Sequence, residues 1–342
     1  MSGTRAGTGL TLGKFAPLHL GHQSMIEAAI RENDKVIVII YDCPETTDIP
    51  LNVRAAWIRT LYPSPNVQVI EAWDGPAAAG DTPEIKQLQE RYILGKLNGK
   101  KIDRFYSSEF YGEHMSIALG AENRQVDPGR KRIPVSGTQV RLAPYDNRAF
   151  LSPVVYRDHV VKAVFLGAPS TGKSTLAAHL SERLRTVWMP EYGREYWEMH
   201  QIERRLTLEQ LEAIAVGHIE REERLALDAR EVLFIDTNAI TTYMFSHDYH
   251  GEATPELTRL AENASSRYDL VFLCDDDIPY DDTWDRSGEV HRQVFQKQIA
   301  ADLQTRRIPY MLLRGTLEER AAQVEAVLRR FRKYRSPYEW LR

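Results

Sequence analysis

The chain has 342 residues, which matches about two domains at a typical 150 residues each. Its formal net charge of -4 argues against a globally basic nucleic-acid binder, and its 43% hydrophobic content excludes wholesale disorder. Cys43 and Cys274 are too few for a disulfide framework, no apolar run is long enough to span a membrane, and the first nine residues lack a signal-peptide core. We therefore expect a soluble intracellular protein of two domains.

The first half of the sequence alternates apolar strands with amphipathic helices, which is typical of an α/β sheet. The run from Val36 to Ile40 is continuously β-branched and predicts a strand buried on both faces, as in a parallel sheet. Thr82 followed by Pro83 predicts the start of a helix. The other predicted elements of this half are strands at 10–12, 67–70 and 104–107 and helices at 24–32 and 53–61.

The second half begins the same pattern again, with a strand at 160–166, a glycine-rich loop and a helix at 174–185. Thr207 and Gln210 form a capping-box pattern at the start of a long helix. Its predicted buried stripe consists of Leu208, Leu211, Ile214, Ala215, His218 and Leu225. Later elements are strands at 187–189, 232–235, 270–273 and 308–313 and a helix at 317–334. We expect the boundary within residues 144–158, which gives domains of residues 1–150 and 151–342.

A first motif runs from Gly13 to His22, after a strand and at the start of a helix. Gly21, between His19 and His22, lets the backbone approach a phosphate closely. The helix start adds free N–H groups and the positive end of a dipole. Two imidazoles at this point would stabilise charge on a transferring phosphoryl group. The alternative is a pair of loop histidines whose partners are backbone groups.

A second motif, Ser136-Gly137-Thr138-Gln139-Val140-Arg141, resembles a Ser-Gly-Thr-x-x-Arg signature of nucleotidyltransferases. The hydroxyls of Ser136 and Thr138 and the guanidinium of Arg141, one helical turn later, suit triphosphate binding. The alternative is an ordinary helix N-cap followed by a surface arginine. Because both motifs occur in the expected order, we favour nucleotidyl transfer.

Residues 167–174, Gly-Ala-Pro-Ser-Thr-Gly-Lys-Ser, match the phosphate-binding P-loop and lie between a predicted strand and a predicted helix. Backbone amides would surround the ATP phosphates, Lys173 would reach the β and γ groups, and Ser174 would bind Mg²⁺. This context predicts a second nucleotide site in the second domain.

Two carboxylates at strand ends are candidates for the remaining kinase roles. Asp236 stands where P-loop proteins place the carboxylate of the Mg²⁺ shell, whereas Glu191 ends the strand next to the P-loop strand. We therefore expect Glu191 to orient the acceptor hydroxyl and take its proton, and Asp236 to face the metal. Which of them is the base stays open. The polar segment 281–289 with Arg292 predicts a lid whose arginines neutralise the transferring group.

These motifs resemble, in their order along the chain, the NadR-type bifunctional proteins, from about residue 10 to residue 331. The resemblance also rests on the segments 41–42, 50–54, 106–112, 126–130, 191–194, 234–237, 268–270 and 279–286. It implies a Rossmann-like nucleotidyltransferase domain followed by a P-loop kinase domain, each with a parallel sheet. The implied reactions are the ATP-dependent phosphorylation of nicotinamide riboside to nicotinamide mononucleotide (NMN), and adenylyl transfer from ATP to NMN, which gives NAD and pyrophosphate.

The predicted site residues follow from the motifs and from this resemblance. In the first domain they are catalytic Lys14, His19, His22 and Arg141, ATP-binding Gly13, Phe15, Ser136, Gly137 and Thr138, and substrate-binding Tyr41, Asp42, Arg54 and Trp57. In the second they are catalytic Lys173, Glu191 and Asp236, ATP-binding Gly167, Ser170, Thr171, Gly172, Lys173, Ser174, Thr175, Arg286 and Arg292, and substrate-binding Tyr192, Arg194, Tyr280, Asp282 and Trp284. Ser174 and Asp236 are the predicted metal ligands. For Trp57, core packing is the alternative to stacking on nicotinamide.

The implied cofactor is Mg²⁺, with ATP as co-substrate, and the implied partners are nicotinamide riboside, NMN and ATP in the cytoplasm. We expect no membrane partner and no DNA, because nine residues before the first strand are too few for a helix-turn-helix domain. The sequence leaves a homo-oligomer and feedback by NAD open. Two alternative functions also remain: the same paired chemistries on another vitamin, such as riboflavin, or one domain kept as a nucleotide sensor. Intact Lys173, Ser174, His19 and His22 weigh against the sensor.

Overall fold

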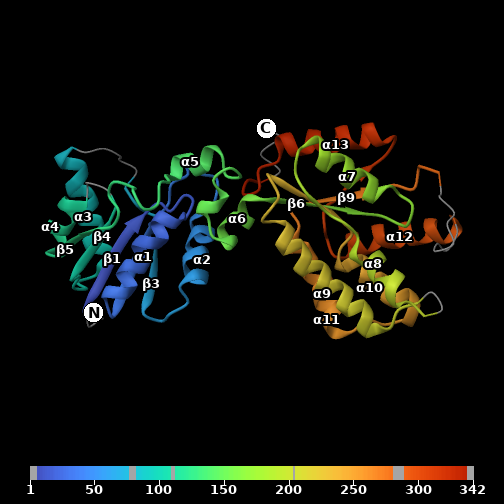
Figure 1. Ribbon diagram of the computed structural model, residues 1–342, viewed down its shortest axis with the longest axis horizontal. Helices are drawn as coiled ribbons and strands as arrows, with labels where there is room; N and C mark the ends of the chain where they lie inside the picture. Colours follow the sequence, from blue (N-terminus) through green and yellow to red (C-terminus); the bar gives the residue numbers. More distant parts are fainter. Residues whose placement is uncertain (1–5, 77–81, 109–111, 203–204, 280–288, 337–342) are drawn as a thin grey trace. The chain divides into compact units, whose positions relative to one another are not determined.

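The computed structural model describes residues 6–76, 82–108, 112–202, 205–279 and 289–336. The predicted site residues Tyr280, Asp282, Trp284 and Arg286 lie outside this part of the chain. The chain divides into two compact units, Met1–Tyr156 and Arg157–Arg342, each with its own parallel sheet (Figure 1). The predicted α/β fold class with two parallel sheets is therefore confirmed. Within the described residues, no helix is both long enough and apolar enough to span a membrane.

The sheet of the first unit has the order β3-β2-β1-β4-β5, and all its neighbouring strands are parallel. The strands are β1 (Thr8–Gly13), β2 (Lys35–Tyr41), β3 (Val67–Ala72), β4 (Arg104–Ser107) and β5 (Glu122–Gln125). The chain moves outward from β1 to β3 and then returns to β4 on the other side of β1. The carboxyl ends of β1 and β4 therefore form a switch point, which is where open α/β sheets bind ligands.

The first unit also contains helices between and after these strands. They are α1 (Leu20–Glu32), α2 (Leu51–Leu61), α3 (Pro83–Leu97), α4 (Gly112–Leu119) and α5 (Gly137–Leu142), followed by the 3₁₀ helix η1 (Arg148–Phe150) and by α6 (Pro153–His159), in which the division between the units falls. Helix α3 begins as predicted, because the Thr82 hydroxyl accepts a hydrogen bond from the Ile85 amide and Pro83 follows it. Ile93 and Leu97 of α3 pack against apolar residues of the strands.

The sheet of the second unit has the order β10-β9-β6-β8-β7, again with parallel neighbours. The strands are β6 (Val161–Leu166), β7 (Trp188–Met189), β8 (Val232–Asp236), β9 (Leu270–Cys274) and β10 (Met311–Leu313). The central strand β6 is buried over residues 162–166. It leads directly into the P-loop, so the motif lies at the carboxyl edge of the sheet, as the sequence predicts. The predicted strand at 308–313 is shorter than expected. The expectation that the strand before Glu191 lies next to the P-loop strand is wrong, because β7 pairs with β8, and β8, which ends at Asp236, is the neighbour of β6.

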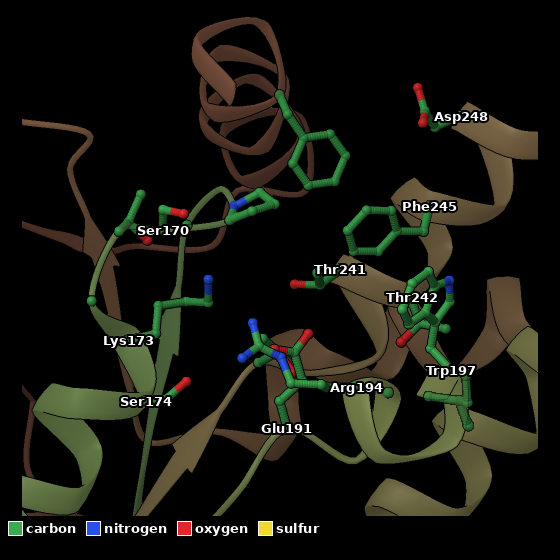
Figure 2. A pocket seen from close by; sticks show the side chains of 18 of the residues that line it. Ser170, Lys173, Ser174, Glu191, Arg194, Trp197, Thr241, Thr242, Phe245 and Asp248 are labelled. Atoms are coloured by element: carbon green, nitrogen blue, oxygen red, sulfur yellow. The ribbon is translucent and has the colours of Figure 1, made fainter. Parts of the chain in front are cut away.

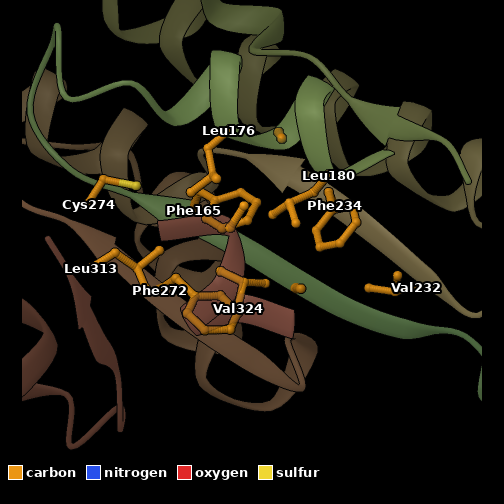
Figure 3. Packing of buried hydrophobic residues seen from close by; sticks show 12 residues of the cluster. Phe165, Leu176, Leu180, Val232, Phe234, Phe272, Cys274, Leu313 and Val324 are labelled. Atoms are coloured by element: carbon orange, nitrogen blue, oxygen red, sulfur yellow. The ribbon is translucent and has the colours of Figure 1, made fainter. Parts of the chain in front are cut away.

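Seven helices are described in the second unit: α7 (Lys173–Arg183), α8 (Tyr192–His200), α9 (Leu208–Leu225), α10 (Ala239–His250), α11 (Pro255–Arg267), α12 (Glu289–Thr305) and α13 (Leu317–Arg330). Figure 3 shows the core formed where α7 and α13 meet the sheet. The Phe165 ring lies between those of Phe234 and Phe272, with centroids 5.9 and 5.6 Å away. Burying three large aromatic rings fixes the strand that carries the P-loop.

Helices α9, α10 and α11 form a second apolar cluster around Ile214, Ala239 and Leu257. The predicted capping box at Thr207 and Gln210 is present at the start of α9. The buried residues of α9 are Leu211, Ile214, Ala215, His218 and Glu222, whereas Leu208 and Leu225 are only partly buried. The helical period therefore predicts four of the buried positions.

Candidate functional site

The histidine motif lies at the carboxyl end of β1, at the switch point of the first sheet. His19 occupies the N-cap position of α1, and its ring stacks on that of His22 with centroids 3.7 Å apart. A β-carbon at Gly21 would lie 3.0 Å from Cε1 of His19, so a larger residue there would press on the stacked rings. The motif thus places two imidazoles side by side at the start of a helix.

Both histidines are neutral at pH 7. Burial, together with the charges of Arg130 and Arg141, lowers the pKa of His19 to about 4, and burial lowers the pKa of His22 well below its ordinary value. The Nδ1 atom of each ring is buried and has no hydrogen-bond partner among the described residues. Unsatisfied buried polar atoms are uncommon in native proteins, and a bound ligand is one way of satisfying them.

The second nucleotidyltransferase motif contacts the first. Nη1 of Arg141 donates to the Ala16 carbonyl at 2.5 Å, and its Nη2 donates to the Thr138 hydroxyl at 3.1 Å. Ser136 caps α5 through a capping box with Gln139, so its hydroxyl serves the helix as the alternative interpretation proposed. The fold therefore brings Arg141 to the histidine loop, while the Ser136 hydroxyl has a structural role.

Three predicted ligand contacts of the first unit lie inside the protein instead. Arg54 is fully buried and donates to the carbonyls of Ile49, Tyr41 and Lys14. Trp57 is 1% exposed, which leaves no open face for stacking and corresponds to the core-packing alternative. Phe15 is equally buried, and its ring contacts that of His22 edge-on at 5.1 Å. The structure thus assigns Arg54 to holding the loops and the two aromatic rings to packing.

The carboxyl edge of the first sheet carries the predicted catalytic Lys14 and the predicted substrate contacts Tyr41 and Asp42. Lys14 is exposed, and its Nζ is 2.7 Å from a carboxylate oxygen of Glu45. Asp42 directly follows β2, and its Oδ1 is 3.6 Å from Nη2 of Arg54. Tyr41 ends β2 and is half-buried. All three therefore remain accessible at the carboxyl edge of the sheet.

Arg130 is a site residue that the predicted set missed. A turn presents it: the Asp127 carboxylate accepts hydrogen bonds from the backbone amides of Lys131, Arg132 and Ile133. Asp127 and Arg130 both have positive φ, at 49° and 48°, which non-glycine residues seldom adopt. The charge of Arg130 acts on both histidines. The sequence feature that pointed to this turn is the Asp-Pro-Gly pattern at residues 127–129, directly before Arg130.

The second unit holds a cavity of about 570 Å³, lined by the P-loop and by residues of α8, α9, α10 and α12. The predicted residues that line it are Gly167, Ser170, Thr171, Gly172, Lys173, Ser174, Thr175, Glu191 and Arg194. Figure 2 shows the side chains of Lys173, Arg194 and Thr241 directed toward a common space. The sequence thus predicts the phosphate side of this cavity well.

The P-loop backbone is held tightly at its first glycine. Gly167 has a φ of +146°, and a β-carbon there would lie 2.7 Å from both the Cys274 carbonyl and the Thr171 hydroxyl. Nζ of Lys173 donates to the Ala168 carbonyl at 2.9 Å. The lysine is therefore already turned toward the space enclosed by the loop, where the phosphates of a nucleotide would lie.

Asp236 and Ser174 have the chemistry of a Mg²⁺ site. The Ser174 hydroxyl donates to Oδ2 of Asp236, while Oδ1 is buried without a partner among the described residues. Burial and the nearby charge of Glu191, opposed by Lys173, raise the pKa of Asp236 to about 6. The described residues contain no cluster of three or more His, Cys, Asp or Glu able to hold a metal alone. A hydroxyl and a carboxylate beside a phosphate loop fit Mg²⁺, which keeps several waters and takes phosphate oxygens.

Besides Asp236, two predicted contacts of the second unit do not line the cavity. The Tyr192 ring packs under the Arg221 guanidinium at 3.9 Å and against Gly217. Arg292 is 2% exposed, and its Nη2 donates to the carbonyls of Asp276 and Ile278 at 3.1 and 2.9 Å. The structure thus places Tyr192 in helix packing and gives Arg292 the role of holding the loop that follows β9.

The other side of the cavity is formed by residues that the sequence interpretation had not assigned to a site. They are Trp197, His218, Thr241, Thr242, Phe245, Asp248, Tyr249, His291 and Phe295. The rings of Phe245 and Phe295 stack with centroids 4.9 Å apart. Most of these residues belong to α10 and α12, which the periodicity did not reveal. A weak signal was present in Asn238, whose side chain caps α10 directly after β8.

These features define a two-domain α/β protein with a nucleotidyltransferase-type site on its first sheet and a P-loop nucleotide site on its second. Comparisons with known families agree: residues 10–143 match the cytidylyltransferase-like family, and residues 162–320 match an AAA domain. Both matches follow the order that the motifs predicted.

Known proteins with the same arrangement are NadR proteins. The trifunctional NAD biosynthesis/regulator protein NadR of Salmonella typhimurium is 29% identical over 328 residues, and that of Escherichia coli is 28% identical over 327. Each match covers 89% of this chain and 78% of the relative. A solved structure of NadR with NAD and AMP-PNP has a TM-score of 0.55 at 21% identity, and one of NadR with NR has a TM-score of 0.56 at 22% identity. Each shares the fold over 95% of this chain and 96% of its own. The predicted NadR-type resemblance is confirmed.

Proposed function

We propose that this protein is a bifunctional enzyme that phosphorylates nicotinamide riboside to NMN and then transfers an adenylyl group from ATP to NMN. The observation that carries the proposal is one phosphate-binding motif at the edge of each sheet, on a chain similar to NadR over 89% of its length. We assign nucleotidyl transfer to residues 1–150 and kinase activity to residues 151–342.

Adenylyl transfer in the first unit needs no covalent enzyme intermediate. An oxygen of the NMN phosphate attacks the α-phosphorus of ATP, the bond from that phosphorus to the bridging oxygen breaks, and pyrophosphate leaves. Neutral His19 and His22 donate hydrogen bonds to the oxygens that gain charge, and the cationic Arg130 and Arg141 lie close to them. The site thus acts by positioning and by electrostatic stabilisation.

Phosphoryl transfer in the second unit uses the cavity beside the P-loop. The 5′-oxygen of the riboside attacks the γ-phosphorus, the bond to the β–γ bridging oxygen breaks, and ADP leaves. Glu191 accepts the proton of the 5′-hydroxyl while Lys173 neutralises phosphate charge. Trp197 and Phe245 offer aromatic faces to the cationic nicotinamide ring.

ATP is the proposed co-substrate of both reactions, and Ser174 and Asp236 would hold the Mg²⁺ of the kinase. When bound, Mg²⁺ supplies positive charge that offsets the phosphate oxygens. The proposed partners are therefore small molecules, namely nicotinamide riboside, NMN and ATP. Since both reactions consume ATP, we also propose a cytoplasmic location.

Mass spectrometry of the products tests this function directly. The full chain is incubated with nicotinamide riboside, ATP and Mg²⁺, and we expect NMN and ADP first, then NAD and pyrophosphate. A parallel incubation contains riboflavin in place of nicotinamide riboside. If riboflavin is phosphorylated and the riboside is not, the substrate is another vitamin and the proposed substrate is wrong. If supplied NMN is converted but the riboside is not, or the reverse, one unit is a nucleotide sensor instead of an enzyme.

A further inference from the structure

The cavity of the second unit contains two buried polar groups that nothing in the described structure satisfies. His218 on α9 is 4% exposed and Thr241 on α10 is 5% exposed, and both line the cavity. Nε2 of His218 and Oγ1 of Thr241 have no hydrogen-bond partner among the described residues. Buried polar atoms without partners cost stability, so a ligand that pairs with them recovers free energy on binding.

The Thr241 hydroxyl lies on the side of the cavity where phosphoryl transfer would take place. Figure 2 shows this hydroxyl directed toward the space in front of the Lys173 ammonium, where the transferred phosphoryl group would lie. Across the cavity, the partly buried Trp197 and Phe245 present aromatic surface that suits a planar base. The Thr241 hydroxyl is thus available to the part of a nucleoside that joins its base to the 5′-oxygen, and His218 lines the same cavity.

The Glu222 carboxylate near His218 already has other partners, so it does not need the His218 ring. The Glu222 carboxylate, one turn later on α9, forms ion pairs with Lys162 at 3.0 Å and with Arg267 at 2.7 Å, and it accepts a hydrogen bond from Tyr268. Burial lowers the pKa of His218, so its ring is neutral at pH 7. A neutral imidazole nitrogen and a hydroxyl each pair well with a hydroxyl group.

We propose that His218 and Thr241 form a polar subsite that binds the ribose hydroxyls of the acceptor nucleoside. The inference rests on the proposed kinase function and adds its sugar specificity: the second unit selects a riboside over deoxy analogues. A site built to hydrogen-bond a substrate hydroxyl rejects analogues that lack it, because the protein groups are then left buried without partners.

The experiment compares variants with substrates. Steady-state kinetics are measured for nicotinamide riboside and for its 2′-deoxy and 3′-deoxy analogues, with the full chain carrying Thr241→Val or His218→Phe. We expect kcat/KM for the riboside to fall at least about tenfold in each variant. For the analogue that lacks the matching hydroxyl, we expect a change of less than about threefold, since that contact is already absent.

Matched variants separate recognition from structure. Thr241→Ser and His218→Gln keep a polar group and should retain discrimination against the deoxy analogues. Thr258→Val serves as the control, because the Thr258 hydroxyl donates to the carbonyl of Thr254, the N-cap residue of α11, and its loss should not affect kinetics. Thermal unfolding verifies each fold, and if His218→Phe does not fold, Thr241→Val carries the test.

Two results would overturn the subsite while leaving the kinase proposal intact. One is an equal loss of kcat/KM on the riboside and on both deoxy analogues. The other is unchanged discrimination in Thr241→Val. Failure of the unsubstituted protein to phosphorylate the riboside would instead overturn the proposed function, and the subsite with it.

Discussion

The Asp236 carboxylate is buried, and the nearby charges of Lys173 and Arg194 offset only part of the effect of burial on its pKa. Only the Ser174 hydroxyl donates to it among the described residues, and Oδ1 has no partner there. Burial and the charge of Glu191 therefore raise the pKa of Asp236 to about 6. A carboxylate kept in this state favours binding of either a proton or a cation, so we expect the two to compete.

This competition predicts how the kinase responds to Mg²⁺ as pH changes. The Mg²⁺ concentration for half-maximal kinase rate should rise as pH falls below about 6, by about tenfold for each further pH unit, because protonated Asp236 must first lose its proton. Asp236→Asn should raise the requirement at pH 7.5 and remove this part of its pH dependence. Initial rates over a Mg²⁺ series at each pH test this. An identical dependence in both proteins would show that Asp236 does not contact the metal.

The division of labour between the two carboxylates yields a second prediction. Glu191→Gln keeps the size of the side chain and removes its charge, so turnover in riboside phosphorylation should fall at least about a hundredfold, within the range for loss of a general base. ATP binding should change little. Rapid-quench turnover and fluorescence titration with an ATP analogue separate the two effects. Near-normal turnover would transfer the acceptor role to Asp236 or to the segment at Asp281 and Asp282.

At the scale of whole elements, the last helix holds the P-loop in place. Arg320 on α13 is 3% exposed, and its Nη1 donates to the Thr171 carbonyl at 2.7 Å. The same side chain donates to the carbonyls of Gly315 and Asp275, and it pairs with the Asp277 carboxylate. One guanidinium thereby ties α13, the P-loop and the loop after β9 together.

A third prediction follows from this contact. Arg320→Lys keeps the charge but loses the planar fork that reaches several carbonyls at once. We expect KM for ATP in the kinase reaction to rise about tenfold, with a smaller change in kcat and none in adenylyl transfer. Arg329→Lys, at an exposed position of the same helix, is the matched control. A change in kcat with an unaltered KM for ATP would contradict a role in shaping the phosphate loop.

Local chemistry made some of these elements predictable from the sequence. Three features depend only on neighbours a few residues away along the chain. They are the helix caps at Thr82 and Thr207, the buried β-branched run of β2 and the glycines of the P-loop. The roles of Arg54 and Arg292 depend instead on carbonyls brought close by the tertiary fold. For His218, the helical period predicts burial but does not tell whether the buried face meets a core or a cavity.

For the molecule as a whole, two separate sites should allow each activity to be removed on its own. Lys173→Ala should lower the rate of riboside phosphorylation by two orders of magnitude or more and leave adenylylation of supplied NMN largely intact. His22→Ala should lower the rate of adenylylation by as much and leave riboside phosphorylation largely intact. Each half-reaction is assayed separately in both folded variants. Loss of both activities through one substitution would contradict the two-site arrangement.

The histidine site also predicts how acid affects stability. The pKa of His19 is about 4 in the folded chain and ordinarily 6.5, so the unfolded chain takes up the proton first as pH falls. The free energy of unfolding should therefore decrease between pH 6.5 and 4, by up to about 3 kcal/mol from this residue. His19→Gln should lose that part of the slope. Urea unfolding of both proteins from pH 7.5 to 4.5 measures the difference, in which titrating groups that do not interact with His19 cancel, whereas the stacked His22 contributes to it. Parallel curves of unfolding free energy against pH would contradict the prediction.

The contact between Arg320 and the P-loop also bears on the order in which a ribosome would complete the two sites. Every residue assigned to the first site precedes residue 142, whereas the loop at 167–174 is held by a side chain 149 positions after Thr171. A growing chain therefore acquires every residue of the histidine site before any residue of the P-loop, and the P-loop gains this support only once α13 has been made. A premature stop or proteolytic cut before α13 should accordingly remove kinase activity first and leave a fragment that still makes NAD from NMN.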